Sequence, residues 1–245
     1  MSLSKFTFTH NVTYNNMFFD RHMAGELLAK KLTRFKYRDV VLYALPKGGV
    51  PVGYEVSKAL GLPLDFLTVQ KIGHPLYPEY GICSVSETGN LICDESGICG
   101  LDRNWLSNEI RFKEEEAYRR RALYKRGEPS ASPENKIAII IDDGIATGIT
   151  MKAAVQAIQD KWPEQIIIAT PVMPHALISE FRKLSDAVVT LIDDREYLGT
   201  VGAYYSYFAE VTDYEVTSLL AKANHHFVQS LPQMSESAVR YKNNN

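Results

Sequence analysis

Two adjacent carboxylates, Asp142 and Asp143, stand between an uninterrupted apolar run at residues 137–141 and a loop with two glycines and two threonines. Loop amides that converge ahead of a helix bind anions, and the positive end of the helix dipole favours the same charge. Carboxylates would repel a phosphate, but they are strong acceptors for sugar hydroxyl groups. The pattern therefore predicts a site for a phosphorylated ribose, to which we assign Asp142, Asp143, Gly144, Ile145, Ala146, Thr147, Gly148, Ile149 and Thr150.

The same stretch has a plainer interpretation, an ordinary strand-to-helix turn in which Asp142 serves only as a helix cap. A plain turn, however, needs neither a second acidic residue nor a second threonine. The apolar run before the loop and the helical pattern after it supply the context that a phosphate-binding motif requires. No Gly-Lys-Ser/Thr sequence follows, which excludes a Walker-type nucleotide loop.

Two earlier loops each place a lysine beside the end of a predicted strand. The segment Pro-Lys-Gly-Gly at residues 46–49 follows an apolar run at 39–45, and a lysine with two glycines suits a second anion. Lys71 follows the next predicted strand, at 64–70. The alternatives are a simple Gly-Gly turn and a solvated surface lysine, since most lysines are exposed.

The elements around these loops are expected to alternate between strand and helix. Continuous apolar runs predict buried strands, and apolar residues recurring every three or four positions predict helices. Strands are expected at 39–45, 64–70, 137–141, 165–172 and 187–192, and helices at 20–33, 51–60, 102–125 and 175–183, with two more after residues 148 and 212. This alternation predicts an α/β fold, a mostly parallel sheet with helices on both faces. Such sheets bind ligands at the carboxyl ends of their strands, where the loops described above begin.

The composition restricts the class of protein. The 245 residues are 45% hydrophobic and 23% charged, which is ordinary for a globular chain with its own core. A formal net charge of -2 argues against a nucleic-acid partner. No apolar stretch reaches membrane-spanning length and the first ten residues do not resemble a secretory signal, so we expect no membrane partner and a cytoplasmic location. The three cysteines, Cys83, Cys93 and Cys99, are odd in number and form no C-x-x-C pair, which argues against disulfides and structural zinc.

The segment DDGIATGIT at 142–150 closely resembles the signature of type I phosphoribosyltransferases, an acidic pair followed by T-G-x-T. The chain is most similar to a bacterial group of these proteins whose acceptor is unassigned. The stretches that carry this likeness span most of residues 18–220 and also include FFDRHMAGELLA, LPKGGVPVG, QKIGHPLYPE and VGAYYSYFAEVTDYEV. That group often has arginine at the positions of Lys47 and Gln70. Lys47 keeps the positive charge but cannot bind a phosphate through two parallel hydrogen bonds as arginine does, and Gln70 carries no charge.

The resemblance implies a type I phosphoribosyltransferase fold in a single domain over residues 1–230. Its core would cover about 38–192, and a small hood would come from about 1–37 and 193–230. The segment 73–100 would be a flexible loop that closes over the reaction centre. Residues 231–245 would form a disordered tail.

The resemblance also implies phosphoribosyl pyrophosphate as substrate and Mg2+ as cofactor. The metal would be held by Asp142 and Asp143 through water. A cis peptide bond is expected between Pro46 and Lys47. The residues implied for pyrophosphate are Pro46, Lys47, Gly48, Gly49 and Lys71, and those implied for catalysis are Asp142, Asp143 and Lys71.

Residues of the hood are expected to contact the acceptor. Ala146 occupies the place where hypoxanthine–guanine enzymes carry an aspartate, so this loop supplies no acid or base to the acceptor. Asp194 and Tyr197 are the candidates for acceptor contacts, and simple packing within the hood is the alternative for Tyr197. A homodimer is the expected assembly, because dimers are the commonest oligomers.

The implied reaction moves ribose 5-phosphate to a nitrogen acceptor, a nucleobase-like ring, with release of pyrophosphate. One alternative is a regulator that binds phosphoribosyl pyrophosphate or a nucleotide as a signal and catalyses little. A phosphohydrolase is a third and weaker interpretation, because no nucleophile motif accompanies the acidic pair. The basic cluster at 119–121 suits either anion binding or the solvated face of a salt-bridged helix.

Overall fold

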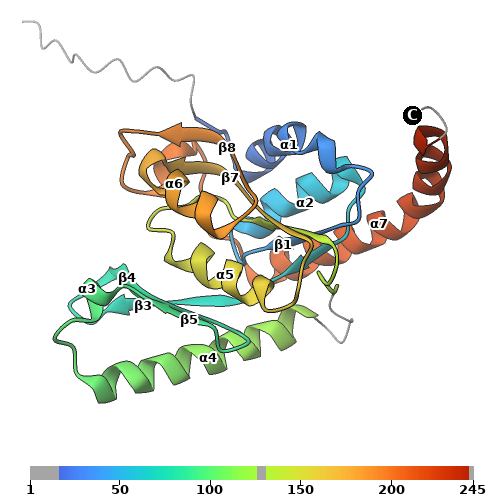
Figure 1. Ribbon diagram of the computed structural model, residues 1–245. Coiled ribbons are helices and arrows are strands. Elements are labelled where there is room, and N and C mark those ends of the chain that lie inside the picture. The colour runs from blue at the N-terminus through green and yellow to red at the C-terminus, as the bar shows by residue number, and fades with distance from the viewer. Residues whose placement is uncertain (1–16, 126–130, 243–245) are drawn as a thin grey trace, which may run out of the picture.

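The computed structural model describes residues 17–125 and 131–242, and a five-stranded parallel sheet lies at its centre (Figure 1). The strands are β1 (Val40–Ala44), β2 (Leu64–Phe66), β6 (Ile137–Ile141), β7 (Gln165–Pro174) and β8 (Ala187–Asp194), in the order β2-β1-β6-β7-β8. All neighbouring strands in this sheet run parallel. The predicted α/β fold is therefore confirmed.

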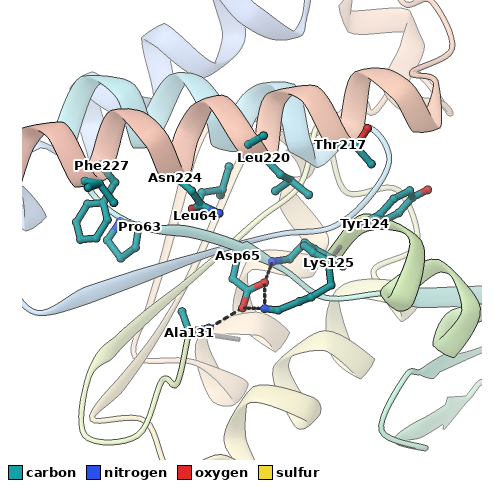
Figure 2. Close-up of a pocket in the computed structure, with 13 residues that line it drawn as sticks. Pro63, Leu64, Asp65, Tyr124, Lys125, Ala131, Thr217, Leu220, Asn224 and Phe227 are labelled. Carbon is teal, nitrogen blue, oxygen red and sulfur yellow. Dashed lines mark hydrogen bonds and ion pairs between the residues drawn. The ribbon is translucent and has the colours of Figure 1, made fainter. Parts of the chain in front are cut away.

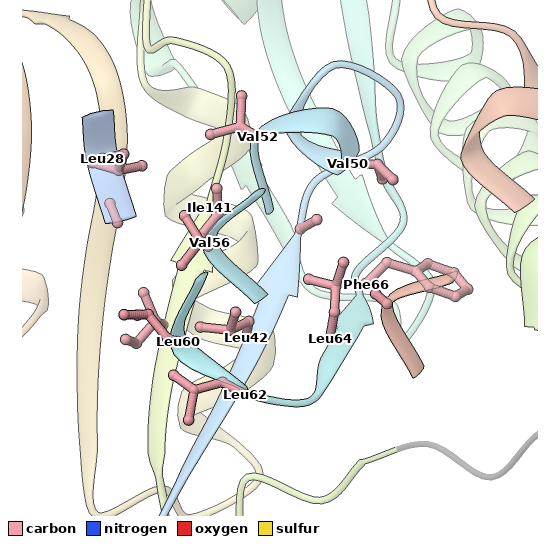
Figure 3. Close-up of a cluster of buried hydrophobic side chains, with 14 of the residues drawn as sticks. Leu28, Leu42, Val50, Val52, Val56, Leu60, Leu62, Leu64, Phe66 and Ile141 are labelled. Atoms are coloured by element: carbon pink, nitrogen blue, oxygen red, sulfur yellow. The ribbon is translucent and has the colours of Figure 1, made fainter. Parts of the chain in front are cut away.

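Helices cover both faces of the sheet because each buried strand presents alternate side chains to opposite sides. On one side Leu42 and Ile139 pack with residues of α1 (Arg21–Lys31), α2 (Gly49–Leu60) and α7 (Asp213–Lys242). Figure 3 shows the part of this cluster around Leu42 and Val56. On the other side Tyr43 and Ile140 pack with residues of α5 (Ile149–Gln159) and α6 (His175–Leu184).

A second, antiparallel sheet projects beside α5 (Figure 1). It consists of β3 (Val69–His74), β4 (Tyr77–Ser86) and β5 (Leu91–Cys93), followed by the short α3 (Glu95–Ile98) and the long α4 (Arg103–Lys125). The single strand predicted at 64–70 is wrong, because its two halves belong to different sheets as β2 and β3. The segment expected as a flexible loop, 73–100, contains two strands and a helical turn.

The expectation of no disulfide is also wrong. Cys83 of β4 and Cys93 of β5 are direct partners in the antiparallel register, and a disulfide joins them with their α-carbons 4.0 Å apart. Cys99 is free and exposed. An odd number of cysteines does not exclude one bridge when strand register brings two of them together.

The first and last helices each begin beside a side chain that caps them. The Asp20 carboxylate accepts from the amide of Met23 at 2.8 Å, and Thr212 Oγ1 accepts from the amide of Glu215 at 3.1 Å. Helix α7 continues through Lys242, beyond the point at which a disordered tail was expected to begin. The hood residues expected at 1–16, and the tail residues 243–245, lie outside the described residues. None of the described helices is both long and apolar enough to span a membrane.

Candidate functional site

The acidic pair emerges from the carboxyl end of the central strand β6, where two candidate anion-binding loops meet. The backbone amide of Asp143 donates a hydrogen bond to Asp142 Oδ1 at 2.9 Å. This bond holds the Asp142 carboxylate against the backbone of Asp143. Burial, reinforced by the adjacent charge of Asp143, raises the pKa of the Asp142 carboxyl well above its usual range. Burial also raises the pKa of Asp143, and the nearby Arg21 guanidinium opposes that rise.

Arg21, the first residue of α1, holds the second carboxylate. Its Nε donates to Asp143 Oδ2 at 2.7 Å, and the two side chains are only 11% and 13% exposed. Its Nη1 donates to the carbonyl of Ala209 at 2.7 Å, and its guanidinium lies 3.7 Å from the centre of the Phe208 ring. Tyr205 donates its hydroxyl to the carbonyl of Asp143 at 2.5 Å. The amino-terminal helix and the segment 205–209 thus close around the acidic pair.

The loop at 46–49 lies directly against the same carboxylates. The predicted cis peptide bond between Pro46 and Lys47 is confirmed. A Cβ on Gly48 would lie 2.0 Å from Asp143 Oδ2, and one on Gly49 would lie 2.7 Å from the carbonyl of Ile141. Glycine is therefore required at both positions for the loops to approach this closely. The ammonium group of Lys47 lies 3.5 Å from Oε1 of Glu210 and 3.5 Å from Oδ1 of Asp213.

The loop at 144–150 leads from the acidic pair into α5. Ile145 is buried and its amide donates to the carbonyl of Val172 at 2.9 Å, while Ala146 and Thr147 are exposed. Gly148 caps the helix with φ +80°, a left-handed conformation that favours glycine. A helix that starts at Ile149 presents its unpaired first amides near Thr147 and Gly148, the arrangement that binds anions.

Lys71 is exposed and lies within β3, where it pairs with Ser84, and is not at the end of a strand of the parallel sheet. The antiparallel sheet nevertheless approaches the 144–150 loop, since Ser84 Oγ is 3.5 Å from Thr150 Oγ1. A cavity of about 430 Å³ separates this sheet from the loop. Its lining residues are Tyr80, Gly81, Ile92, Cys93, Asp94, Glu95, Thr147, Ile149 and Lys152.

The two hood residues predicted to contact the acceptor have different surroundings. The Asp194 carboxylate accepts from the hydroxyl of Tyr204 at 2.6 Å and from the amide of Glu196 at 2.9 Å, so both contacts fix the hood itself. The Tyr197 ring stacks on Tyr204 with centroids 5.5 Å apart. Its hydroxyl is buried and has no hydrogen-bond partner among the described residues. Burial, helped by the charge of Asp143, raises the pKa of Tyr197 to about 12, so the hydroxyl stays protonated at neutral pH and can donate a hydrogen bond.

Sequence reasoning missed Arg21, Tyr205 and Phe208 as residues of the site. One local signal pointed to Arg21, because a cation in the first turn of a helix opposes the helix dipole. Such a local conflict is expected where a distant partner compensates it. Nothing local marks Tyr205 or Phe208, whose contacts depend on how the hood folds back on β6.

A separate cavity of about 350 Å³ lies between α7, β2 and the end of α4, away from the acidic pair (Figure 2). Its walls are mainly apolar, including Leu64, Leu220 and Phe227. Its buried acid, Asp65, already pairs with Lys125 at 3.2 Å and accepts from the amide of Ala131 at 2.8 Å. This cavity offers no unsatisfied charge for chemistry among the residues that the structure describes.

Comparison with known proteins identifies the family of this chain. The phosphoribosyl transferase domain family matches residues 19–205. Two Mycobacterium tuberculosis proteins with phosphoribosyl transferase in their names, Rv0571c (strain H37Rv) and MT0597 (strain CDC 1551), are each 35% identical to this chain over 216 residues. These alignments cover 87% of this chain and 48% of each relative, so the chain spans about half the length of the curated relatives it matches.

A solved structure supports the same assignment. The crystal structure of TT1426 from Thermus thermophilus superposes with a TM-score of 0.69 at 33% sequence identity, covering 84% of this chain and 98% of TT1426. The family match includes the acidic pair, the 46–49 loop and the 144–150 loop. The chain therefore belongs to the phosphoribosyl transferase domain family, and its signature loop is of type I.

Proposed function

We propose that this chain moves ribose 5-phosphate from phosphoribosyl pyrophosphate to a nitrogen atom of a nucleobase-like acceptor and releases pyrophosphate. The contact between the acidic pair and the 46–49 loop supports this most directly, since a Cβ on Gly48 would lie 2.0 Å from Asp143 Oδ2. In phosphoribosyl pyrophosphate the diphosphate is attached to C1, next to the 2-hydroxyl. A diphosphate loop and a diol-binding acid must therefore touch, as these two loops do.

The 5-phosphate would bind at the far end of the loop that begins with the acidic pair. The acids stand at its start, and the α5 amino terminus with Thr147 and Thr150 stands at its end. Ribose would lie between the two ends, its hydroxyls donating to Asp142 and Asp143 and its phosphate accepting from loop amides. Lys47 would exchange its contacts with Glu210 and Asp213 for the diphosphate, which Lys71 would approach from β3.

The donor set fits a magnesium ion that arrives with the substrate. The described residues contain no group of three or more His, Cys, Asp or Glu side chains able to hold a metal. Magnesium commonly binds through one or two carboxylates together with substrate phosphates, and Asp142 and Asp143 would supply that contact through water. When bound, the ion neutralises charge on the diphosphate and makes it a better leaving group.

The chain's own residues would act mainly by positioning and by electrostatics. The acceptor nitrogen attacks C1 with its lone pair, the bond from C1 to the diphosphate oxygen breaks, and pyrophosphate leaves with that electron pair. The nitrogen then loses its proton to water or to a base outside the 144–150 loop, since Ala146 can neither give nor take one. The charge that develops on the ribose ring is stabilised by the carboxylates on its diol.

Pyrophosphate release from phosphoribosyl pyrophosphate, magnesium and a panel of nucleobases tests the proposal. Acceptor-dependent release with formation of a nucleotide is expected, and it should disappear in the double variant Asp142→Asn, Asp143→Asn. The exposed Asp39→Asn is the matched control and should keep full activity. Tight binding without acceptor-dependent release would identify a regulator instead, and release without any acceptor would identify a hydrolase.

A further inference from the structure

Arg21 joins three parts of the molecule that the chain order keeps apart. It belongs to α1, it binds a carboxylate 122 residues further along, and it binds the carbonyl of Ala209, 188 residues away. Both nitrogen contacts are 2.7 Å long, which is the length of strong charge-assisted hydrogen bonds. The flat face of the guanidinium is covered by the Phe208 ring at 3.7 Å, a distance at which cations attract aromatic rings.

These contacts require an arginine. A guanidinium can donate along two directions while its face stacks on a ring, and a lysine ammonium cannot reproduce that fork. The position is also unfavourable for a cation, since it is the first residue of a helix with no acid in its first turn. Burial of the Arg21–Asp143 pair adds a desolvation cost. The arrangement is therefore explained by what it does to Asp143 rather than by what it adds to α1.

The Asp143 carboxylate has little freedom once Arg21 is in place. Gly48 closes one side of it and the Arg21 Nε–H holds Oδ2, while the hydroxyl of Tyr205 fixes the carbonyl of the same residue. Arg21 thus uses its Nε for Asp143 and its Nη1 for Ala209.

We infer that Arg21 is a positioning residue that fixes the Asp143 carboxylate for the ribose diol and couples it to the hood segment 205–209. The inference rests on the proposed function, because the ribose diol is the group that Asp143 would bind. The coupling of the acidic loop to the hood can be measured without any substrate.

Three variants test the inference. Arg21→Met removes the charge and the fork, and Arg21→Lys keeps the charge alone. Arg38→Met is the matched control, because Arg38 forms an exposed ion pair with Glu164 at 3.9 Å. Thermal unfolding establishes that each variant is folded. Steady-state kinetics then give kcat and the KM for phosphoribosyl pyrophosphate, and hydrogen exchange of the unliganded proteins follows amides at 142–148 and 205–211.

A positioning role predicts that kcat falls on the order of 10²-fold in both Arg21 variants, because small misplacements of a reacting group cost that much. KM should change less than about threefold, since ground-state binding is not what is lost. Exchange should accelerate in both segments in Arg21→Met and in neither in Arg38→Met. If Arg21→Met does not fold, Arg21→Lys makes the same prediction.

Three results would overturn the inference. Full kcat in Arg21→Lys would mean that charge alone matters, and a raised KM at unchanged kcat would make Arg21 a direct substrate ligand. Unchanged exchange at 142–148 and 205–211 would mean that no coupling exists. If the wild-type protein releases no pyrophosphate with any acceptor, the proposed function fails, and the exchange measurement alone then decides whether Arg21 couples the two segments.

Discussion

The α-carbon of Gly48 lies against the carboxylate of Asp143, and a methyl group on Gly48 would stand 2.0 Å from Oδ2. The Gly48→Ala variant is therefore expected to force the two loops apart and to weaken phosphoribosyl pyrophosphate binding by more than about tenfold, or 1.4 kcal/mol. Calorimetric titration with magnesium present measures this loss. Gly100→Ala adds local backbone strain, since Gly100 has φ +79°, but its Cβ would meet nothing within 4 Å, so this control should bind normally. Normal binding by Gly48→Ala would contradict the close contact of the two loops.

Asp142 is expected to lower the stability of the folded protein at neutral pH. Burial and the Asp143 charge raise its pKa, so ionisation is harder in the folded than in the unfolded chain. For an acid with a raised pKa, stability is fully present at low pH and is lost as pH rises from the unfolded toward the folded value. Asp142→Asn should therefore melt at a higher temperature than wild type at neutral pH, with the difference vanishing in acid. Melting curves without ligand or metal check this, and the exposed Asp39→Asn should show no such gain.

The Cys83–Cys93 disulfide is expected to stabilise the antiparallel sheet beside the site. It closes a short loop, with a sequence separation of 10, and bridges of this kind contribute roughly 2–4 kcal/mol. The Cys83→Ser, Cys93→Ser double variant should unfold at lower urea concentration than the oxidised wild type. The free and exposed Cys99→Ser should not. Equal midpoints for the double variant and the oxidised protein would argue against the bridge.

Arg121 is expected to be a stability residue, unlike its exposed neighbour Arg119 in the basic cluster. It donates to the carbonyl of Phe66 at 2.6 Å and pairs with Glu87 at 2.8 Å, with both charged side chains largely buried. Removing one member of a buried pair costs roughly 3–5 kcal/mol. Arg121→Met should therefore lower the free energy of unfolding by that amount in urea titrations. The exposed Arg119→Met should change it by less than about 0.5 kcal/mol.

The parts of the fold that could be predicted are those whose pattern is local. The apolar run at 137–141 and the acids and glycines after it indicate a buried strand and its ligand loop within a dozen residues. The break between β2 and β3 could not be predicted, because no glycine or proline interrupts residues 64–70 and all of them are buried. Burial is the same on both sides of the break, and only the long-range pairing of β3 with β4 separates the two strands.

The missed features depend on contacts between distant parts of the chain. The register of β4 and β5 brings Cys83 opposite Cys93, and this register cannot be inferred from the spacing of the two cysteines. The location of Asp143 at the end of a buried strand could be predicted from its neighbours, whereas its partner Arg21 belongs to a helix that precedes the sheet. The expected contact of Asp194 with an acceptor remains a prediction, and the hydroxyl of Tyr204 already binds that carboxylate.

The helix that supplies Arg21 lies entirely before β1, outside the sheet that carries the signature loop. A fragment trimmed to start at the first strand would retain the signature loop at 142–150. Its acidic pair would nevertheless lack the cation that holds it. A shortened form made for crystallisation or fusion should therefore keep the amino-terminal helix together with the acidic pair.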